Sequence, residues 1–301
     1  MTNYSVIIPH FTKKGTEMLC RAISSVPIRD DIEVIVVDNS LKPIPSELFK
    51  KNKMVSIYYS DNKRGAGGAR NVGLTKAKGK WLLFMDADDF FTEKAFESFD
   101  RYKDSEYDII FFRPTSCDSD TYKLSDRHYA VCTEIDGYMK TGDEYGLRCR
   151  DFDVPWAKMI RREMVEANNI CFDEVPASND VMFSLKTGLA AREITVSPDT
   201  VYCVTKSLES ITNTVSLRNL ESVFEVKIRK NQLLKENGLP RASSVANTIR
   251  KSAGYGIKPF LAFLWRAIST GNLLVGYNRW PETVLRICKN RLASRKENQE
   301  H

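Results

Sequence analysis

Three carboxylates fall within four positions of the segment "WLLFMDADDF" (81–90), directly after an apolar run: Asp86, Asp88 and Asp89. Two like charges about 4 Å apart repel by roughly 4 kcal/mol at an effective dielectric near 20. In an extended chain, Asp86 and Asp88 point to the same side. A divalent cation, Mn²⁺ or Mg²⁺, would remove this repulsion and keep positions open for phosphate oxygens. The alternative is a solvated turn in which Asp88 or Asp89 caps a following helix, "FFTEKAFESF".

Two further residues have types and positions that suit a nucleotide. Asp38 ends the apolar run "IEVIVVD" (32–38), where a carboxylate can accept a ring N–H. The alternative for Asp38 is a turn acid that bonds its own backbone around Asn39 and Ser40. Arg70 is expected in the first turn of a helix, and a helix N-terminus together with an arginine favours a diphosphate. The alternative for Arg70 is an exposed helical arginine.

Apolar patterns predict the elements that must position these residues. Five buried strands are predicted at 4–9, 32–38, 54–60, 80–86 and 106–112. Helices are predicted at 16–26 and 69–79 from apolar spacing and a Gly stop at Gly79. Strands that alternate with helices and are apolar throughout indicate an α/β fold with a mostly parallel sheet covered on both faces. Because ligands bind at the carboxyl ends of such strands, Asp38 and the acid cluster are expected at one edge.

The composition is typical of a globular protein, with 42% apolar and 28% charged residues in 301. No apolar run approaches the ~20 residues that a membrane-spanning helix needs. The seven cysteines are scattered without a C-x-x-C pair, so we expect reduced, mostly buried thiols rather than a zinc or disulfide framework. Pro9 ends the first apolar run, so we expect no signal peptide and a cytoplasmic location.

Several segments together resemble family 2 glycosyltransferases of the GT-A fold. The matching pieces are "YSVIIPHF", "EVIVVDNS", "GGARNVGLTKAKGKWLLFMDADD", "VPWAKMIRREMV", "ICFDE" and "ASNDVMF", in the family's order and spacing. The resemblance covers about residues 4 to 210. It implies a GT-A catalytic domain at 1–212, with a nucleotide-binding half at about 1–112 and an acceptor half at about 113–212. The remainder, 213–301, is predicted to be a helical, basic extension.

The resemblance implies a role for each residue on the donor side. The segment from Pro9 to Phe11 would line the nucleoside pocket, and Asp38 would accept the N3–H of a uracil ring. Arg70 would face the diphosphate, Asp86 would contact the ribose, and Asp88 would bind the metal that bridges the donor's phosphates.

On the acceptor side, the resemblance implies Asp180 as the general base and places Trp156, within "VPWAK", near the acceptor. The alternative for Asp180 is a helix acid favoured by the macrodipole, with Ser178 as the helix N-cap. The family prefers an acid before Asp180, and Asn179 stands there, so Asp180 is expected to be less basic than in relatives.

Two departures from the family pattern lie on the donor side. Asn39 replaces the second acid that usually follows "VVD". Between Asn62 and Arg70 the chain is one residue longer, and "GAGG" replaces the common serine, so no contact at 62–68 is transferred. "GAGGAR" lacks the Gly or Ala that a dinucleotide-binding fingerprint needs at its sixth position.

The sequence therefore predicts an inverting, metal-dependent transferase that moves a hexosyl or N-acetylhexosaminyl group from a UDP-sugar to a hydroxyl of a saccharide or lipid-linked saccharide. Assembly of a surface or capsular polysaccharide is the expected setting, and no nucleic acid is expected as a partner. Two alternatives stay open. One is a metal-dependent nucleotidyltransferase, for which "PHFTKKGTE" is a poor phosphate loop, and the other is an inactive nucleotide-sugar binding module.

The basic extension has two interpretations. From Lys251 onward, nine Lys or Arg face three Asp or Glu, so this part holds the whole chain's net charge of +6. Residues 258–296 combine basic residues with apolar and aromatic ones, which predicts peripheral contact with an anionic membrane at the inner face of the cell membrane. The alternative is that these helices pack on the catalytic domain. Residues 205–214 are predicted to be a lid over the donor or a plain linker.

Overall fold

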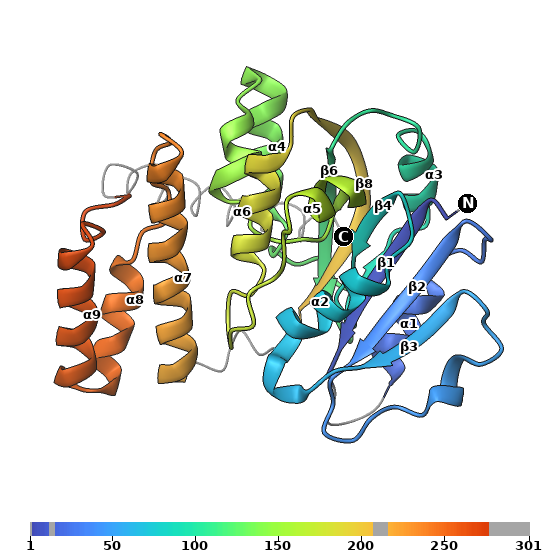
Figure 1. Ribbon diagram of the computed structural model, residues 1–301, viewed down its shortest axis with the longest axis horizontal. Helices are drawn as coiled ribbons and strands as arrows, with labels where there is room; N and C mark the ends of the chain where they lie inside the picture. Colours follow the sequence, from blue (N-terminus) through green and yellow to red (C-terminus); the bar gives the residue numbers. More distant parts are fainter. Residues whose placement is uncertain (1, 12–15, 207–215, 277–301) are drawn as a thin grey trace. The chain divides into compact units, whose positions relative to one another are not determined.

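A computed structural model describes residues 2–11, 16–206 and 216–276 of the chain. Within these ranges, eight strands form one sheet in the order β3-β2-β1-β4-β7-β6-β8-β5 (Figure 1). The strands are β1 (Tyr4–His10), β2 (Ile32–Asp38), β3 (Val55–Tyr59), β4 (Trp81–Phe84), β5 (Phe90–Phe91), β6 (Ile109–Asp118), β7 (Lys158–Arg161) and β8 (Ile194–Lys206).

The sheet has a parallel half and a mixed half. β3, β2, β1 and β4 are parallel neighbours, so their carboxyl ends meet at one edge. β7 is antiparallel to both β4 and β6, whereas β8 runs parallel to β6. Four of the seven strand pairings are parallel, and the mostly parallel α/β sheet predicted from the sequence is confirmed.

Helices cover both faces of the sheet, with α2 in front of the parallel strands and α1 behind them in Figure 1. Their apolar side chains enclose a core in which every residue of β1 is buried. The first group of helices is α1 (Glu17–Ser24), α2 (Gly65–Lys76), α3 (Ala95–Asp100), α4 (Tyr129–Thr141), α5 (Arg162–Ala167) and α6 (Val181–Ala190).

Pro9 lies inside β1, where a proline is usually excluded because it cannot donate to the ladder. β1 pairs with β2 along its whole length but with β4 only as far as Ile7. The carbonyl of His10 bonds to Asn39 on the β2 side, so the nitrogen of Pro9 faces the side where β4 has already ended. The proline therefore removes no ladder bond, and it marks the point where the edge opens.

Helix α2 begins four residues earlier than predicted, because "GAGG" is helical rather than a loop. Gly73 explains how closely α2 packs on β1, since a Cβ atom there would lie 2.4 Å from Cγ2 of Ile7. Real Cβ contacts are never this short, so a larger residue would force the helix and the strand apart.

Several other boundaries differ from the sequence prediction. β4 ends at Phe84 rather than at residue 86, and the next helix, α3, begins at Ala95 with Lys94 as its N-cap. Asp88 and Asp89 therefore do not cap that helix, and the helix-cap alternative is wrong. β6 continues to Asp118, beyond the predicted end at residue 112, because its second half pairs with β8 across a bulge.

The chain divides into two compact units. The first contains Met1–Val175 and Phe183–Ser207, and the second contains Pro176–Met182 and Leu208–His301. The predicted division at 212/213 falls within 207–215, which lie outside the described residues, as does most of the predicted lid. That Pro176–Met182 belong to the second unit was not predicted.

The second unit contains the helices α7 (Leu217–Glu236), α8 (Ala246–Ser252) and α9 (Ile257–Ser269). α7 begins at a serine N-cap, with the side chain of Ser216 accepting a bond from the N–H of Asn219. The helices share a small apolar core that includes Phe224 and Phe263, whose rings lie 4.5 Å apart. In the part of the chain that the structure describes, no helix is both long and apolar enough to cross a membrane.

Candidate active site

The candidate site lies at the carboxyl edge of the parallel strands, as the sequence predicts. β1 ends at His10, β2 at Asp38 and β4 at Phe84, two residues before Asp86. Because these strands are adjacent and parallel, three segments far apart in the chain deliver polar side chains to one edge.

The acid cluster forms a tight turn that is fastened to β8. The N–H of Asp89 donates to the carbonyl of Asp86 at 3.1 Å, which closes the turn. The buried hydroxyl of Tyr202 accepts from the N–H of Asp86 at 3.0 Å and donates to Oδ2 of Asp89 at 2.8 Å. The N–H of Thr205 donates to the other oxygen of Asp89 at 2.7 Å. Asp89 is thus a structural acid, and it holds the turn by its side chain.

Burial raises the pKa of Asp89 well above its ordinary value, and the neighbouring Asp88 and Asp86 raise it further. The pKa of Asp88 is also raised, first by burial and then by Asp86, although Arg127 and Arg21 oppose the shift. Across the described residues, no other side chain bonds to the carboxylate of Asp88. The turn therefore concentrates negative charge that its own surroundings only partly compensate.

Two side chains that the sequence did not single out position the backbone of Asp88. Nη2 of Arg21, from α1, donates to the carbonyl of Asp88 at 2.5 Å, and Oγ1 of Thr205 donates to the same carbonyl at 2.8 Å. The guanidinium of Arg21 also lies over the ring of Phe90, 5.2 Å from its centroid. No local pattern could have identified these residues, because they lie 67 and 117 positions from Asp88 in the chain.

Arg70 is buried in the second turn of α2, rather than in the first turn as predicted. Its Nη2 donates to Oδ1 of Asp86 at 2.6 Å, and its guanidinium lies 5.4 Å from the ring centroid of Phe172. The structure thus brings Arg70 and Asp86 together at the edge. A phosphate that reached this arginine would have to share it with Asp86.

Asp38 is completely buried, and each of its oxygens already accepts hydrogen bonds within the protein. Oδ1 lies 3.0 Å from Nδ1 of His10 and accepts from the N–H and the hydroxyl of Ser40 at 3.1 and 2.6 Å. Oδ2 accepts from the N–H of Ile44 at 2.8 Å. These bonds lower the pKa of Asp38 although burial opposes them. The carboxylate organises the turn after β2, as the turn-acid alternative describes.

The side chain of the neighbouring Asn39, unlike that of Asp38, has an oxygen that accepts no hydrogen bond among the described residues. This atom is Oδ1, and the residue as a whole is buried. An unsatisfied buried acceptor is costly in a folded protein, so it points to a ligand or an ordered water. In the sequence, Asn39 differs from the family pattern only by replacing an acid, whereas in the structure it is the open acceptor at the end of β2.

The remaining predicted residues are distributed as follows. Pro9 is buried within β1, and Phe11, just after that strand, is exposed. Trp156 is buried and stacks on the ring of Tyr202, with centroids 5.3 Å apart and an interplanar angle of 2°. Trp156 therefore touches the residue that fastens the acid cluster.

Asp180 directly precedes the first residue of α6. Ser178 has a left-handed backbone with a φ of 60°, so it does not have the extended conformation of an N-cap. Asp180 belongs to the second unit, whereas the acid cluster belongs to the first.

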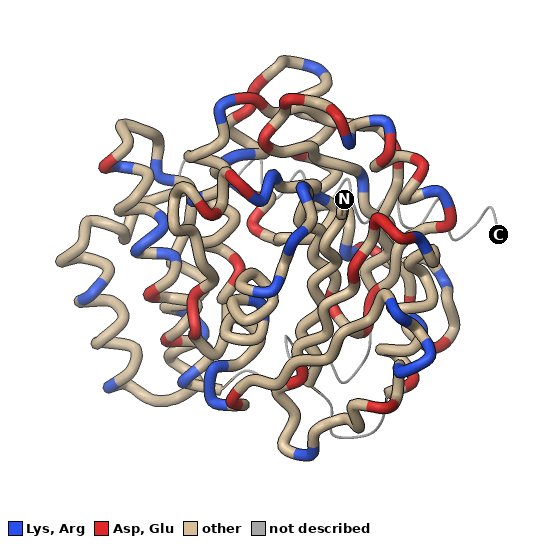
Figure 2. The backbone as a smooth tube through the Cα atoms, turned by 45° about the vertical axis from the view of Figure 1, so that its right-hand side comes forward, with Lys and Arg blue, Asp and Glu red and all other residues tan. Residues whose placement is uncertain are grey.

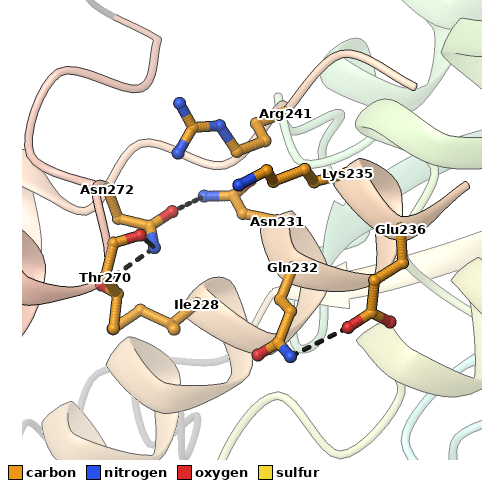
Figure 3. A pocket seen from close by; sticks show the side chains of 8 residues that line it. All are labelled: Ile228, Asn231, Gln232, Lys235, Glu236, Arg241, Thr270 and Asn272. Atoms are coloured by element: carbon orange, nitrogen blue, oxygen red, sulfur yellow. Dashed lines mark hydrogen bonds between the residues drawn. The ribbon is translucent and has the colours of Figure 1, made fainter. Parts of the chain in front are cut away.

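A pocket of about 410 Å³ lies in the second unit, and no predicted site residue lines it (Figure 3). Its two buried asparagines bond to each other, with Nδ2 of Asn231 donating to Oδ1 of Asn272 at 2.7 Å. Because both amides also bond to main-chain groups, we assign them to the packing of the helices. The pocket is lined by Ile228, Asn231, Gln232, Lys235, Glu236, Arg241, Thr270 and Asn272.

The mostly parallel sheet with an acid turn after β4 agrees with the GT-A fold expected from the sequence. Residues 5–168, more than half of the chain, match the model of glycosyl transferase family 2. The chain belongs to this family.

Two curated relatives match about two thirds of the chain. It is 26% identical over 218 residues to a Bacillus subtilis protein named as the glycosyltransferase EpsH, covering 69% of this chain and 62% of that protein. It is 25% identical over 213 residues to the poly(ribitol-phosphate) β-N-acetylglucosaminyltransferase TarS of Staphylococcus aureus, covering 67% of this chain and 35% of TarS. The match thus spans less than two thirds of either relative.

Solved structures show the same fold. The crystal structure of S. aureus TarS 1–349 in complex with UDP-GlcNAc has a TM-score of 0.60 at 20% identity, covering 89% of this chain and 73% of that chain. A mannosyltransferase from Pyrobaculum calidifontis in complex with GDP-Man and Mn²⁺ has a TM-score of 0.52 at 14% identity, covering 96% and 86%. The GT-A fold predicted from the sequence is confirmed.

Proposed function

We propose that the protein is an inverting glycosyltransferase that moves a sugar from a UDP-sugar to an acceptor hydroxyl. The observation that carries the proposal is the acid turn at Asp86–Asp89, which is fastened to β8 and faces Arg70 at the carboxyl edge of the sheet. Membership of glycosyl transferase family 2 supports sugar transfer over nucleotidyl transfer. Release of UDP rather than pyrophosphate distinguishes the two reactions.

The site fits a divalent cation, Mn²⁺ or Mg²⁺, at Asp88. This carboxylate is half-buried, its pKa is raised, and no cationic side chain bonds to it among the described residues. Residues 2–11, 16–206 and 216–276 contain no group of three or more side chains placed to hold a metal. One carboxylate with the donor's phosphates and water is a common ligand set for these ions. The cation would supply positive charge to the leaving diphosphate.

Arg70 would assist the departure of UDP by moving one N–H from Asp86 to a phosphate oxygen. Asp86 would then be free to accept a ribose hydroxyl. Both shifts start from the same 2.6 Å bond, so donor binding is expected to break it. The guanidinium of Arg70 is already buried and oriented, so it would stabilise the charge that develops on the leaving UDP.

The structure suggests Asn39 as the acceptor for the ring N3–H, in place of the predicted Asp38. Every contact of the Asp38 carboxylate is internal, whereas Oδ1 of Asn39 lacks a partner in the described structure. Asp38 would not contact the uracil ring itself but would shape the turn that positions Asn39. Replacing Asn39 by alanine is then expected to weaken UDP binding without lowering the melting temperature.

Asp180 is proposed as the general base that takes the acceptor's proton as its oxygen attacks the anomeric carbon. Attack from the face opposite the diphosphate would turn an α-linked donor into a β-linked product. TarS is named as a β-N-acetylglucosaminyltransferase, so UDP-GlcNAc is the first donor to test. We propose a surface polysaccharide as the product, with a saccharide or lipid-linked saccharide as the acceptor at the cytoplasmic face of the membrane.

The test is a thermal-shift screen of nucleotide sugars with and without Mn²⁺. A ligand at 100 times its Kd stabilises the folded state by about 2.7 kcal/mol, so the correct donor should stand out. The Asp88→Asn variant keeps the side-chain shape and should lose the Mn²⁺-dependent shift with UDP. Asp104→Asn, at an exposed turn acid, is the matched control.

Unchanged UDP affinity of Asp88→Asn in Mn²⁺ would remove the metal role. If the correct donor binds but is never hydrolysed or transferred in the presence of metal, the inactive binding module is the better interpretation.

A further inference from the structure

Helix α9 carries an exposed apolar stripe, which we define as Ile257, Leu261, Trp265 and Ile268. Their spacing of four, four and three residues places them on one face of the helix. The exposed fractions of these four residues are 67%, 53%, 71% and 50%, in chain order. A different face of α9 already serves the core, where Phe263 and Ala267 are buried against α7 and α8. The four residues of the stripe therefore do not contribute to the core of the second unit.

The chain around the stripe is basic and free of acids. Between residues 237 and 281 there is no Asp or Glu, whereas Arg250, Lys251, Lys258 and Arg266 all fall in its described part. In Figure 2 the tube of the described part of this stretch, residues 237–276, is blue and tan without red. Arg266 pairs with Glu225 of α7, at 3.2 Å between Nη2 and Oε2. Lys258 is the second residue of α9, directly after Ile257.

We infer that the stripe of α9 is a docking surface for an anionic lipid bilayer, with α9 lying in the plane of the interface. Aliphatic side chains and a tryptophan on one face, with lysine and arginine beside them, match the chemistry of helices that insert at the headgroup level. Tryptophan in particular favours this level of a membrane.

Charge decides between the bilayer and other occupants. A second copy docked stripe to stripe would bring Lys258 of one copy towards the basic residues of the other. Residues 277–301 carry six Lys or Arg against three Asp or Glu, so this segment would also place positive charge against a basic surface. An anionic surface is the occupant whose charge complements that of the stripe's surroundings.

Membrane docking rests on the proposed function only for its biological role, because a lipid-linked acceptor would lie at the membrane surface. Membrane binding and sugar transfer are separate properties, and each can be measured without the other.

The experiment is co-sedimentation of the full chain with vesicles of phosphatidylcholine, with and without phosphatidylglycerol. We expect binding to the vesicles that contain phosphatidylglycerol, little binding to pure phosphatidylcholine, and weakening by salt. The double variant Leu261→Gln/Trp265→Gln should reduce the partition coefficient at least about tenfold, because both interfacial side chains are lost. Both positions are more than half exposed, so the variant should keep the wild-type melting temperature.

Two control variants make the same kinds of substitution at exposed positions outside α9, and one further variant tests the charge beside the stripe. Ile28→Gln replaces an apolar residue that is 83% exposed and should bind vesicles like the wild type. Lys258→Glu should weaken binding and reduce its salt dependence, whereas Lys53→Glu, at another exposed lysine, should not.

No binding to anionic vesicles at low salt would overturn the inference, as would equal binding by the double variant and the wild type. If the wild type is a dimer in solution and the double variant is a monomer, the stripe is a contact between copies instead. UDP release from the donor without vesicles should be the same in wild type and double variant. If neither protein releases UDP, but the wild type binds vesicles and the double variant does not, the proposed transfer reaction is refuted and the docking surface is supported.

Discussion

Replacing Tyr202 by phenylalanine tests whether the acid turn is held from β8. The substitution keeps the ring, and therefore the stacking contact with Trp156 at 5.3 Å. It removes only the hydroxyl, which donates to Asp89 at 2.8 Å and accepts from the N–H of Asp86 at 3.0 Å. Two groups of the turn thereby lose a partner in a place that water cannot easily reach.

The expected loss can be worked from these two bonds. At a pH above the raised pKa of Asp89, the hydrogen bond to its charged carboxylate contributes about 1.5–3 kcal/mol. An orphaned buried N–H costs about 1–3 kcal/mol. Because the turn can relax partly, we expect a total near the lower ends, about 3 kcal/mol. For a folded unit of this size that corresponds to a fall in melting temperature of roughly 6–12 °C.

The pH dependence of this loss follows from the raised pKa of Asp89. The bond from Tyr202 is strongest to the ionised carboxylate, which predominates above the raised pKa. As the pH falls through that pKa, Asp89 takes up a proton and the charge-assisted part of the bond disappears. The stability difference between wild type and Tyr202→Phe should therefore shrink towards acidic pH.

The assay is thermal unfolding followed by circular dichroism, together with Mn²⁺-dependent binding of UDP. Tyr102→Phe is the matched control, since its ring packs on Phe112 and its hydroxyl makes no hydrogen bond in the described structure. That control should melt with the wild type. Tyr202→Phe should melt lower and bind UDP more weakly, because the turn that presents Asp88 is loosened. If Tyr202→Phe and Tyr102→Phe unfold together, β8 does not fasten the acid turn.

Three further predictions follow from other contacts. Asp180→Asn should lower kcat by roughly 10² to 10⁴ with little change in donor binding, and near wild-type turnover would remove its role as the base. Gly73→Ala should destabilise by about 1–3 kcal/mol because its Cβ would lie 2.4 Å from Ile7, whereas Gly137→Ala, a helical position with open space, should stabilise by about 0.5–1 kcal/mol in the same urea titration. The Arg29 guanidinium bonds to Asp31 and lowers the pKa of that carboxyl, so this stabilisation is present at neutral pH and is lost as the pH falls through the lowered pKa. Arg29→Met should therefore cost about 1–2 kcal/mol at neutral pH and little in strong acid, and a pH-independent cost would show that packing alone is responsible.

The sequence by itself determined the class of fold and the edge of the sheet at which the candidate residues lie. The apolar runs at 4–9 and 32–38 predict strands because a strand covered on both faces must be apolar throughout. Asp38 and the acid cluster belong at one edge because the carboxyl ends of parallel strands meet there. Such inferences depend on patterns within a few residues, and on the rule that relates strand direction to ligand position.

Only the tertiary structure decided which polar atoms are engaged and which are open. Asp38 and Asn39 are neighbours in the chain, yet the oxygens of Asp38 are filled by His10, Ser40 and Ile44 while Oδ1 of Asn39 has no partner in the described residues. Asp88 and Asp89 look alike in the sequence, but Tyr202 and Thr205 bond the side chain of Asp89 and make it structural. Both partners come from one strand, β8, more than one hundred residues away in the chain. Hydrogen bonding depends on the positions of single atoms, and the sequence pattern fixes only which face or edge a residue occupies.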